Sequence, residues 1–173
     1  MQRPHANTYW LEPSRILAGE YPCHIGTGST EERLRDYLAC GITDFLDLTT
    51  EGELEPYEDQ LSRLASTMSI EVSYCRLPIL DMSVPERPEV MVEILDEIER
   101  RLDAGGTVYL HCWGGIGRTG TVAGCFLVRN GLTGDAALGQ LARLWPQMKK
   151  SLWYPSTPQT EQQFEYVRNW RED

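Results

Sequence analysis

The chain has 173 residues, of which 41% are hydrophobic and 24% are charged, the composition of an ordinary globular domain. This mixture excludes a disordered or collagen-like chain, and a length near the roughly 150 residues of an average domain predicts one domain over residues 1–173. With 16 Lys and Arg against 26 Asp and Glu, the net charge of −10 argues against nucleic acid and anionic membrane surfaces as partners.

The first half of the chain is predicted to alternate strands with helices. A Ser-x-x-Glu capping box that starts at Ser29 opens a helix, and Gly41 ends it. Three prolines between residues 78 and 88 interrupt regular structure and predict a loop. The predicted elements are a strand over residues 15–18, a helix over residues 29–41, a strand over residues 42–48, a helix over residues 57–67 and a strand over residues 70–77.

Helices predominate in the second half. Apolar residues on one helical face predict a helix over residues 91–102, which two glycines end. A Thr-x-x-Gln box opens the last helix at Thr160, and its residues Phe164, Val167 and Trp170 are expected to face inward. The further predicted elements are a strand over residues 107–111, a helix from residue 117 towards residue 130 and a helix over residues 133–145.

Strands separated by helices predict an α/β fold. The expected architecture is a mostly parallel central sheet of four to five strands, flanked by helices on both faces, with a phosphate-binding loop between a strand and a helix. Ligands of such sheets bind beyond the carboxyl ends of the strands. Functional residues are therefore expected in the loops that follow the strands.

Membrane spans, secretion signals, disulfides and metal sites are not predicted. The longest apolar runs, such as residues 122–128, are far shorter than the ~20 residues that cross a bilayer, and the first residues contain no apolar signal core. The five cysteines include no CxxC pair and no His-rich cluster, which indicates reduced thiols and a cytoplasmic location. They are Cys23, Cys40, Cys75, Cys112 and Cys125.

A glycine-rich loop follows the strand over residues 107–111. The chain reads HCWGGIGRTG from His111 to Gly120, and the next helix begins within this run. Glycines allow close backbone approach and a helix N-terminus offers N–H donors, so the loop is expected to hold a tetrahedral anion such as phosphate or sulfate. The expected phosphate-binding loop comprises Trp113, Gly114, Gly115, Ile116, Gly117, Arg118 and Thr119.

Three side chains of this run suit phosphoryl transfer. Cys112 lies at a helix N-terminus beside Arg118, where the thiolate is stabilised relative to the thiol and can act as a nucleophile. The planar fork of Arg118 can bind two phosphate oxygens and strengthens its hold as charge develops on them. Thr119 offers a hydroxyl that can stabilise the sulfur as a leaving group.

Cys75 or Cys125 is a candidate partner of Cys112 in a regulatory disulfide, although sequence spacing does not establish their proximity.

The run from His111 to Gly120 resembles the signature His-Cys-x5-Arg-Thr-Gly of the cysteine-dependent protein tyrosine phosphatase superfamily. The resemblance implies a phosphocysteine intermediate, with no metal and no cofactor. The size and the order of strands and helices look like the compact dual-specificity branch, and Tyr9-Trp10 with residues 16–22 look like bacterial members of that branch. The resemblance also implies that His111 orients the loop and tunes the cysteine, while a hydrogen-bonded core histidine fits equally well.

A carboxylic acid is expected above the loop, because the leaving oxygen must be protonated. Residues 77–85 follow a predicted strand and precede a helix, which places them at the same edge of the sheet as Cys112. The segment is similar to the family's general-acid loop, in which an Asp precedes a Pro. Asp81 is therefore the expected acid.

Two further acidic features follow an earlier predicted strand. Asp47 competes with Asp81 for the acid role, although the family pattern gives it none. Glu51, Glu53 and Glu55 are expected to form a solvated edge. If that edge borders the pocket, it would repel substrates that carry extra phosphates.

The resemblance extends to the approach to the last helix. Tyrosine-specific members of the superfamily place a water-positioning Gln there, and Gln159 and Gln163 are the matching positions. Capping of the helix explains Gln163 without a catalytic role. Trp153 and Tyr154 are expected to pack in the core rather than to frame the pocket.

The expected function is hydrolysis of phosphotyrosine, and also of phosphoserine and phosphothreonine, in phosphorylated protein substrates. A phosphoinositide or inositol phosphate phosphatase is the alternative, because related families use the same loop for those substrates. Lipid-directed members typically add lysines within the loop, whereas Trp113 and Ile116 are uncharged, which favours protein substrates. A catalytically silent phospho-binding module is the third reading, but such modules usually lack the Cys or the Arg.

Overall fold

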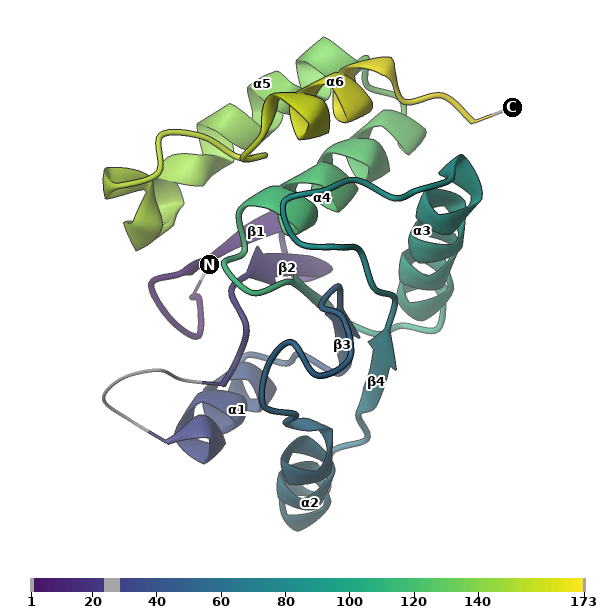
Figure 1. Ribbon diagram of the computed structural model, residues 1–173. Coiled ribbons are helices and arrows are strands. Elements are labelled where there is room, and N and C mark those ends of the chain that lie inside the picture. The colour runs from purple at the N-terminus through teal and green to yellow at the C-terminus, as the bar shows by residue number, and fades with distance from the viewer. Residues whose placement is uncertain (1, 24–28, 173) are drawn as a thin grey trace.

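The computed structural model describes residues 2–23 and 29–172, which fold around one five-stranded sheet (Figure 1). The strands are β1 (Thr8–Glu12), β2 (Ile16–Gly19), β3 (Asp44–Asp47), β4 (Ser73–Arg76) and β5 (Val108–His111). The helices are α1 (Thr30–Ala39), α2 (Glu58–Met68), α3 (Pro88–Asp103), α4 (Gly117–Arg129), α5 (Gly134–Leu144) and α6 (Glu161–Asn169), with 3-10 turns η1 (Trp145–Gln147) and η2 (Lys149–Leu152). No helix in this described part combines the length and the apolar character needed to cross a membrane.

The strands lie in the order β1, β2, β5, β3, β4. β2, β5, β3 and β4 pair in parallel, and β1 is antiparallel to β2. This mostly parallel sheet with flanking helices confirms the predicted α/β fold. Because the four parallel strands point the same way, their carboxyl ends meet along one edge of the sheet, called the carboxyl edge below.

β1 is absent from the predicted strands. It joins β2 through a turn in which the Arg15 N–H donates to the Glu12 carbonyl (3.1 Å) and Ser14 adopts the left-handed conformation, with φ of 61°. The run from Thr8 to Leu11 contains one β-branched residue and two aromatic residues, which is typical of a strand. The signal was therefore present, and β1 adds an antiparallel edge to the sheet.

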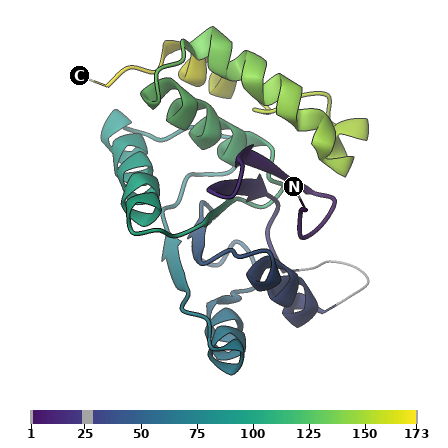
Figure 2. The ribbon, with the colours of Figure 1, turned by 180° about the vertical axis from the view of Figure 1, so that it is seen from behind.

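Side chains of each strand alternate between two faces, and each face has its own core. In β5, Val108 and Leu110 pack with α3, α4, α5 and α6, whereas Tyr109 packs with α1 and α2. Figures 1 and 2 show these two helical layers on opposite sides of the sheet. The arrangement explains why β2 and β5 each contain three consecutive apolar residues, as expected for strands covered on both faces.

Both predicted capping boxes are present. The Ser29 hydroxyl accepts from the Glu32 N–H (3.1 Å), and the Glu32 carboxylate accepts from the Ser29 N–H (2.9 Å). Thr160 and Gln163 make the equivalent reciprocal pair at the start of α6. These bonds satisfy N–H groups that a helix start leaves without partners, so α1 and α6 begin where the sequence indicates.

Candidate active site

The loop after β5 packs directly on the end of β2. Gly115 has φ of 72°, and a Cβ atom at this position would lie 2.3 Å from the backbone carbonyl carbon of Gly19. Only glycine combines this backbone conformation with such a close approach. The glycines of the predicted phosphate-binding loop thus allow it to curl against the carboxyl edge.

Three carbonyl groups of this loop accept hydrogen bonds from outside it. In a trans peptide unit the C=O and the following N–H point in opposite directions. The N–H groups of Gly114, Gly115 and Gly117 therefore point to the side away from these donors, as an anion cradle requires. The three bonds are Tyr21 N–H to Trp113 O (2.9 Å), Lys150 Nζ to Gly114 O (3.0 Å) and Thr157 Oγ1 to Ile116 O (2.7 Å).

Cys112 lies in a cavity of about 380 Å³ at the carboxyl edge and is only 3% exposed. The hydroxyl of Thr119 is buried and makes no hydrogen bond within the described residues, so it is available to an incoming group. Larger hollows of about 570 and 520 Å³ lie at the opposite edge of the sheet, away from this loop. The Cys112 cavity is lined by Asp81, Met82, Cys112, Trp113, Gly114, Ile116, Gly117, Arg118, Lys150, Tyr154 and Gln159.

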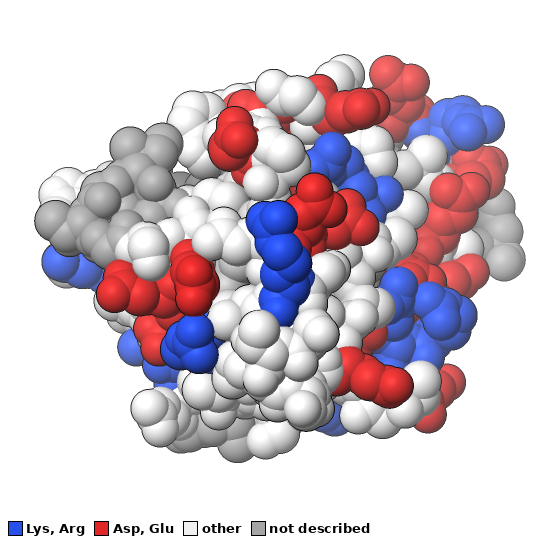
Figure 3. Space-filling model, turned by 90° about the horizontal axis from the view of Figure 1, so that it is seen from below, with Lys and Arg blue, Asp and Glu red and all other residues white. Residues whose placement is uncertain are grey.

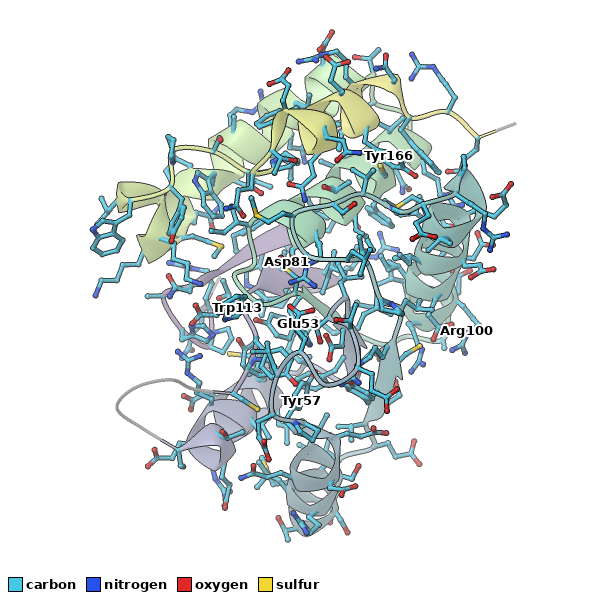
Figure 4. The ribbon with its side chains drawn as sticks, viewed as in Figure 1. Glu53, Tyr57, Asp81, Arg100, Trp113 and Tyr166 are labelled. Carbon is cyan, nitrogen blue, oxygen red and sulfur yellow. The ribbon has the colours of Figure 1, made fainter. Side chains whose placement is uncertain are left out.

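Arg118, in the first turn of α4, has a buried guanidinium with two carboxylate partners. These partners, Glu53 and Asp81, lie close together in Figure 4. The Glu53 carboxylate accepts from Nη2 (2.6 Å) and Nη1 (2.9 Å), and Asp81 Oδ1 lies 2.9 Å from Nη2. Nη1 also donates to the Ile79 carbonyl (3.1 Å), while Nε has no partner among the described residues. The two terminal nitrogens of the guanidinium are thus already bound, and the Nε–H is available to donate to a phosphate oxygen.

The placement of Glu53 contradicts the prediction of a solvated edge. Glu51 and Glu55 are exposed as expected, but Glu53 points inward because its Oε2 accepts from both the N–H and the hydroxyl of Thr50, each at 3.0 Å. Partial burial raises the pKa of Glu53, but hydrogen bonds from Arg118 and Thr50 outweigh this effect and hold it below its usual value. The Thr50-x-x-Glu53 spacing is a capping-box pattern and was the available signal.

Asp81 and Asp47 lie in different surroundings. The Asp81 side chain is 51% exposed, lines the Cys112 cavity and contacts Arg118. Asp47 is fully buried outside that cavity, where it accepts from the Thr49 N–H (2.8 Å), the Thr49 hydroxyl (2.7 Å) and the Tyr74 hydroxyl (2.8 Å). The geometry therefore favours Asp81 over Asp47 as a proton donor to a ligand in the cavity.

His111 is a buried side chain that also contacts the backbone of the loop. It is fully buried, its Nε2 lies 2.6 Å from the Tyr57 hydroxyl, and its Nδ1 lies 3.4 Å from the Cys112 carbonyl. Burial lowers the pKa of His111 below its usual value, although Asp47 opposes the shift. Because a carbonyl only accepts, Nδ1 carries the hydrogen in this neutral ring and Nε2 accepts from Tyr57. His111 is thus a core histidine that also holds the backbone of Cys112.

The two candidate glutamines are separated by the structure. Gln159 is exposed and lines the Cys112 cavity. Gln163 is fully buried outside it, where its Oε1 accepts from the N–H groups of Gln159 and Thr160 and its Nε2 donates to the Ser83 carbonyl (2.9 Å). Gln163 therefore ties the Asp81 loop to α6, and only Gln159 can contact a ligand in the cavity.

The prediction that Trp153 and Tyr154 pack in the core is wrong. Trp153 is 67% exposed and Tyr154 is 45% exposed, and Tyr154 lines the Cys112 cavity. The core position is taken by Trp145, whose indole N–H donates to the Tyr154 carbonyl (2.7 Å). This bond leaves the side chains that follow η2 on the surface.

Lys150 is a cavity residue that the sequence analysis did not identify. Its ammonium group lies 2.7 Å from Glu20 Oε2 and donates to the phosphate-binding loop at Gly114. No motif links position 150 to the loop, so only the tertiary structure brings it there.

The five cysteines are free in the structure. Burial raises the pKa of the Cys125 thiol well above its usual value, which lowers the reactivity of this thiol.

Comparisons with known proteins agree with this site. A family model named PTP-SAK, for the Swiss Army Knife protein DSP-PTPase phosphatase domain, matches residues 5–173. The chain is similar to cyclin-dependent kinase inhibitor 3 of Sus scrofa, with 32% identity over 94 residues, which are 52% of this chain and 42% of that protein. The chain spans less than half the length of the three curated relatives compared.

Solved structures share the fold over nearly the whole chain. The crystal structure of Tk-PTP in the active form has 26% sequence identity, a TM-score of 0.73 and coverage of 94% of both chains. PTPMT1 in complex with PI(5)P has 16% identity, a TM-score of 0.67 and coverage of 93% of this chain and 92% of that one. Since the family model includes the Cys112 loop and nearly every residue of the protein, the chain belongs to the PTP-SAK family of DSP-PTPase domains, within the cysteine-dependent tyrosine and dual-specificity phosphatases.

Proposed function

We propose that the protein hydrolyses phosphotyrosine, and also phosphoserine and phosphothreonine, in proteins. The observation that carries the proposal is the presence of Cys112, Arg118 and Asp81 around one cavity whose floor is the phosphate-binding loop. A nucleophile, a bidentate cation and a carboxylic acid are the groups that phosphomonoester hydrolysis needs.

In the first step the Cys112 thiolate attacks phosphorus. An S–P bond forms, the P–O bond to the substrate breaks, and its electron pair goes to the leaving oxygen. Asp81, in its protonated form, gives that oxygen a proton, so the dephosphorylated residue leaves as a neutral hydroxyl. The product on the protein is a phosphocysteine at Cys112.

In the second step a water molecule attacks the phosphocysteine. The Asp81 carboxylate takes a proton from this water, a new P–O bond forms, and the S–P bond breaks with its electron pair returning to sulfur. The hydroxyl of Thr119, which has no other partner among the described residues, can donate to the departing thiolate. Inorganic phosphate and the Cys112 thiolate are the products.

Arg118 links binding to proton transfer. Glu53 holds both terminal nitrogens, so an incoming phosphate reaches Nε and the position on Nη2 that Asp81 occupies. A phosphate there displaces Asp81 from its cation. The displaced carboxyl group then stands beside the leaving oxygen.

A protein substrate is favoured by the charges and the aromatic group at the cavity. Trp113 is 52% exposed at the mouth, where its ring can contact a phenyl ring. Lys150 is already paired with Glu20, so further phosphates of an inositol ring would meet no unpaired cation in the loop. Unpaired phosphates near a protein of net charge −10 lose affinity.

The test compares kcat/KM for a phosphotyrosine peptide and a soluble phosphoinositide at one ionic strength. The peptide is expected to be the better substrate, and Cys112→Ser should bind it without turning it over. A clear advantage for the phosphoinositide would support the alternative substrate class, for which PTPMT1 with PI(5)P is a structural precedent at the level of the fold. Failure of the wild-type protein to hydrolyse any aryl phosphate would instead indicate a phospho-binding module.

A further inference from the structure

Exposed apolar side chains gather around the Cys112 cavity. Within residues 2–23 and 29–172, six large hydrophobic residues are exposed, and their exposed fractions range from 45% to 74%. Three of them line the cavity, and the others are their near neighbours in the chain. We refer to the six as the apolar collar: Leu80, Met82, Trp113, Leu152, Trp153 and Tyr154.

The collar comes from three separate parts of the chain. Leu80 and Met82 flank Asp81 in the loop after β4, and Trp113 belongs to the phosphate-binding loop after β5. Leu152 ends η2, and Trp153 and Tyr154 follow it. Single exposed apolar residues are normal on a protein surface, but convergence around one cavity is not explained by folding. An apolar surface of this kind marks a binding site.

A second hollow extends the apolar surface beyond Asp81. This hollow of about 240 Å³ is lined by Leu80, the chain neighbour of Asp81, which lines the Cys112 cavity. Most of its lining is apolar, so it suits the side chain of a residue close to the phosphorylated one. It is lined by Thr50, Pro78, Ile79, Leu80, Val84, Pro85, Glu86, Arg87 and Val90.

The charges nearby argue against an acidic or membrane-bound occupant. Lys150 is paired with Glu20 and Arg118 with Glu53, so neither cation at the cavity is in excess. Figure 3 shows the molecule from below, where Lys and Arg lie beside Asp and Glu. A protein of net charge −10 is repelled by anionic bilayers.

We infer that the apolar collar binds large apolar side chains that flank the phosphorylated residue of a protein substrate. The inference rests on the proposed function, since it requires a peptide whose phosphate reaches Cys112. Three collar residues line the Cys112 cavity and Leu80 lines the second hollow, so a bound segment covers the collar while its phosphate occupies the loop. Burial of one or two aliphatic or aromatic side chains should raise kcat/KM roughly 10-fold or more.

The experiment compares two phosphotyrosine peptides of equal length and charge. One has Leu and Phe on both sides of the phosphotyrosine, and the other has Ser and Gly there. Wild-type protein should hydrolyse the apolar peptide with a kcat/KM roughly 10-fold higher, mainly through a lower KM. The double variant Leu152→Ser/Trp153→Ser should remove most of this preference and keep the wild-type rate on a small aryl phosphate, because neither residue lines the cavity.

Arg143→Ser is the matched control, since Arg143 is an exposed residue of α5 outside the collar, and it should keep the preference. Equal kcat/KM for the two peptides in the wild-type protein would overturn the inference and leave the proposed function intact. Hydrolysis of a soluble phosphoinositide with no hydrolysis of either peptide would overturn the proposed function itself. Co-sedimentation with phosphatidylcholine or phosphatidylserine vesicles that the double variant loses, without a peptide preference, would assign the collar to membranes instead.

Discussion

Asp47 and Asp81 are two carboxylates near the same edge of the sheet, and the fold treats them in opposite ways. Asp47 is fully buried and accepts three hydrogen bonds, whereas Asp81 is 51% exposed and contacts an arginine that Glu53 also holds. A buried carboxylate is tolerated only when its oxygens are satisfied, so it cannot release a partner without a large cost. The comparison teaches that only Asp81 has a partner that a ligand can replace, which is why the proposed mechanism gives proton transfer to Asp81.

The largest effect is expected from removing the exchangeable carboxylate. Asp81→Asn should lower kcat by roughly 100- to 10,000-fold, the usual contribution of general acid catalysis, and should flatten the loss of rate at higher pH. Its melting temperature should stay near that of the wild type, because the side chain is half exposed. Steady-state kinetics on an aryl phosphate and a thermal melt measure both.

Asp47→Asn is the counterpart that tests the comparison. An amide at this position turns one acceptor into a donor among Thr49, Tyr74 and Arg76, so the free energy of unfolding should fall by about 1–3 kcal/mol. The rate of hydrolysis by the folded fraction of Asp47→Asn should keep the pH dependence of the wild type. If Asp47→Asn flattened the profile and Asp81→Asn did not, the acid would be Asp47.

A smaller effect is expected from Glu53, which orients Arg118 without touching substrate. Glu53→Gln keeps the length of the side chain but replaces a charge-assisted bidentate pair, so kcat/KM on an aryl phosphate should fall roughly 10-fold. Glu55→Gln, in the exposed part of the same loop, is the control and should have no effect. A purely structural role would lower the melting temperature of Glu53→Gln and leave the kinetics of its folded fraction unchanged.

The smallest effect concerns pH and two histidines, the fully buried His111 and the partly buried His5. Burial lowers the pKa of His111, and burial with Arg33 nearby lowers the pKa of His5 to about 4 from 6.5. The unfolded chain therefore binds more protons below pH 6.5, so stability is complete above that pH and declines as the pH falls through it. Between pH 7.5 and 5.5 the contribution of His5 should fall by about 1 kcal/mol, and that of His111 should fall in the same direction.

Urea unfolding of the wild type and of His5→Gln at the two pH values measures this decline. In His5→Gln, the part of the decline in stability that arises from His111 should remain. The lowered pKa of Glu53 does not interfere, because a carboxylate of that kind loses its stabilising effect only below its ordinary value of 4.5. Equal stability of the wild type at pH 7.5 and 5.5 would contradict the neutral state assigned to His111.

Much of the fold could be predicted because its signals are local. Both capping boxes and the apolar face of α3 depend on residues three or four apart, and each is found where the spacing indicates. Strand ends were less certain: Ile42 and Leu48 were predicted within a strand but lie just outside β3. They remain fully buried, since an apolar core extends beyond the hydrogen-bonded ladder.

The composition of the candidate site could be predicted only where a motif covers it. His111 to Arg118 are contiguous, so their juxtaposition follows from the chain itself. Glu53, Lys150 and Tyr154 come from distant segments, and their positions depend on how loops fold and pack. The sequence spacing of Thr50 and Glu53 indicated a local bond, but no spacing indicates that a carboxylate 65 residues away will hold Arg118.

The contacts of Gln163 set an order of events during synthesis. The Gln163 side chain donates to the Ser83 carbonyl in the Asp81 loop. It also lies against Gly117, where α4 begins, because a Cβ atom at Gly117 would lie 2.9 Å from the Gln163 amide. A domain that emerges from the ribosome N-terminus first therefore has Cys112 and Arg118 synthesised before Gln163, the residue that fixes the acid loop. The nascent chain cannot complete this site until α6 has docked, so the proposed hydrolytic activity would begin only when the domain is whole.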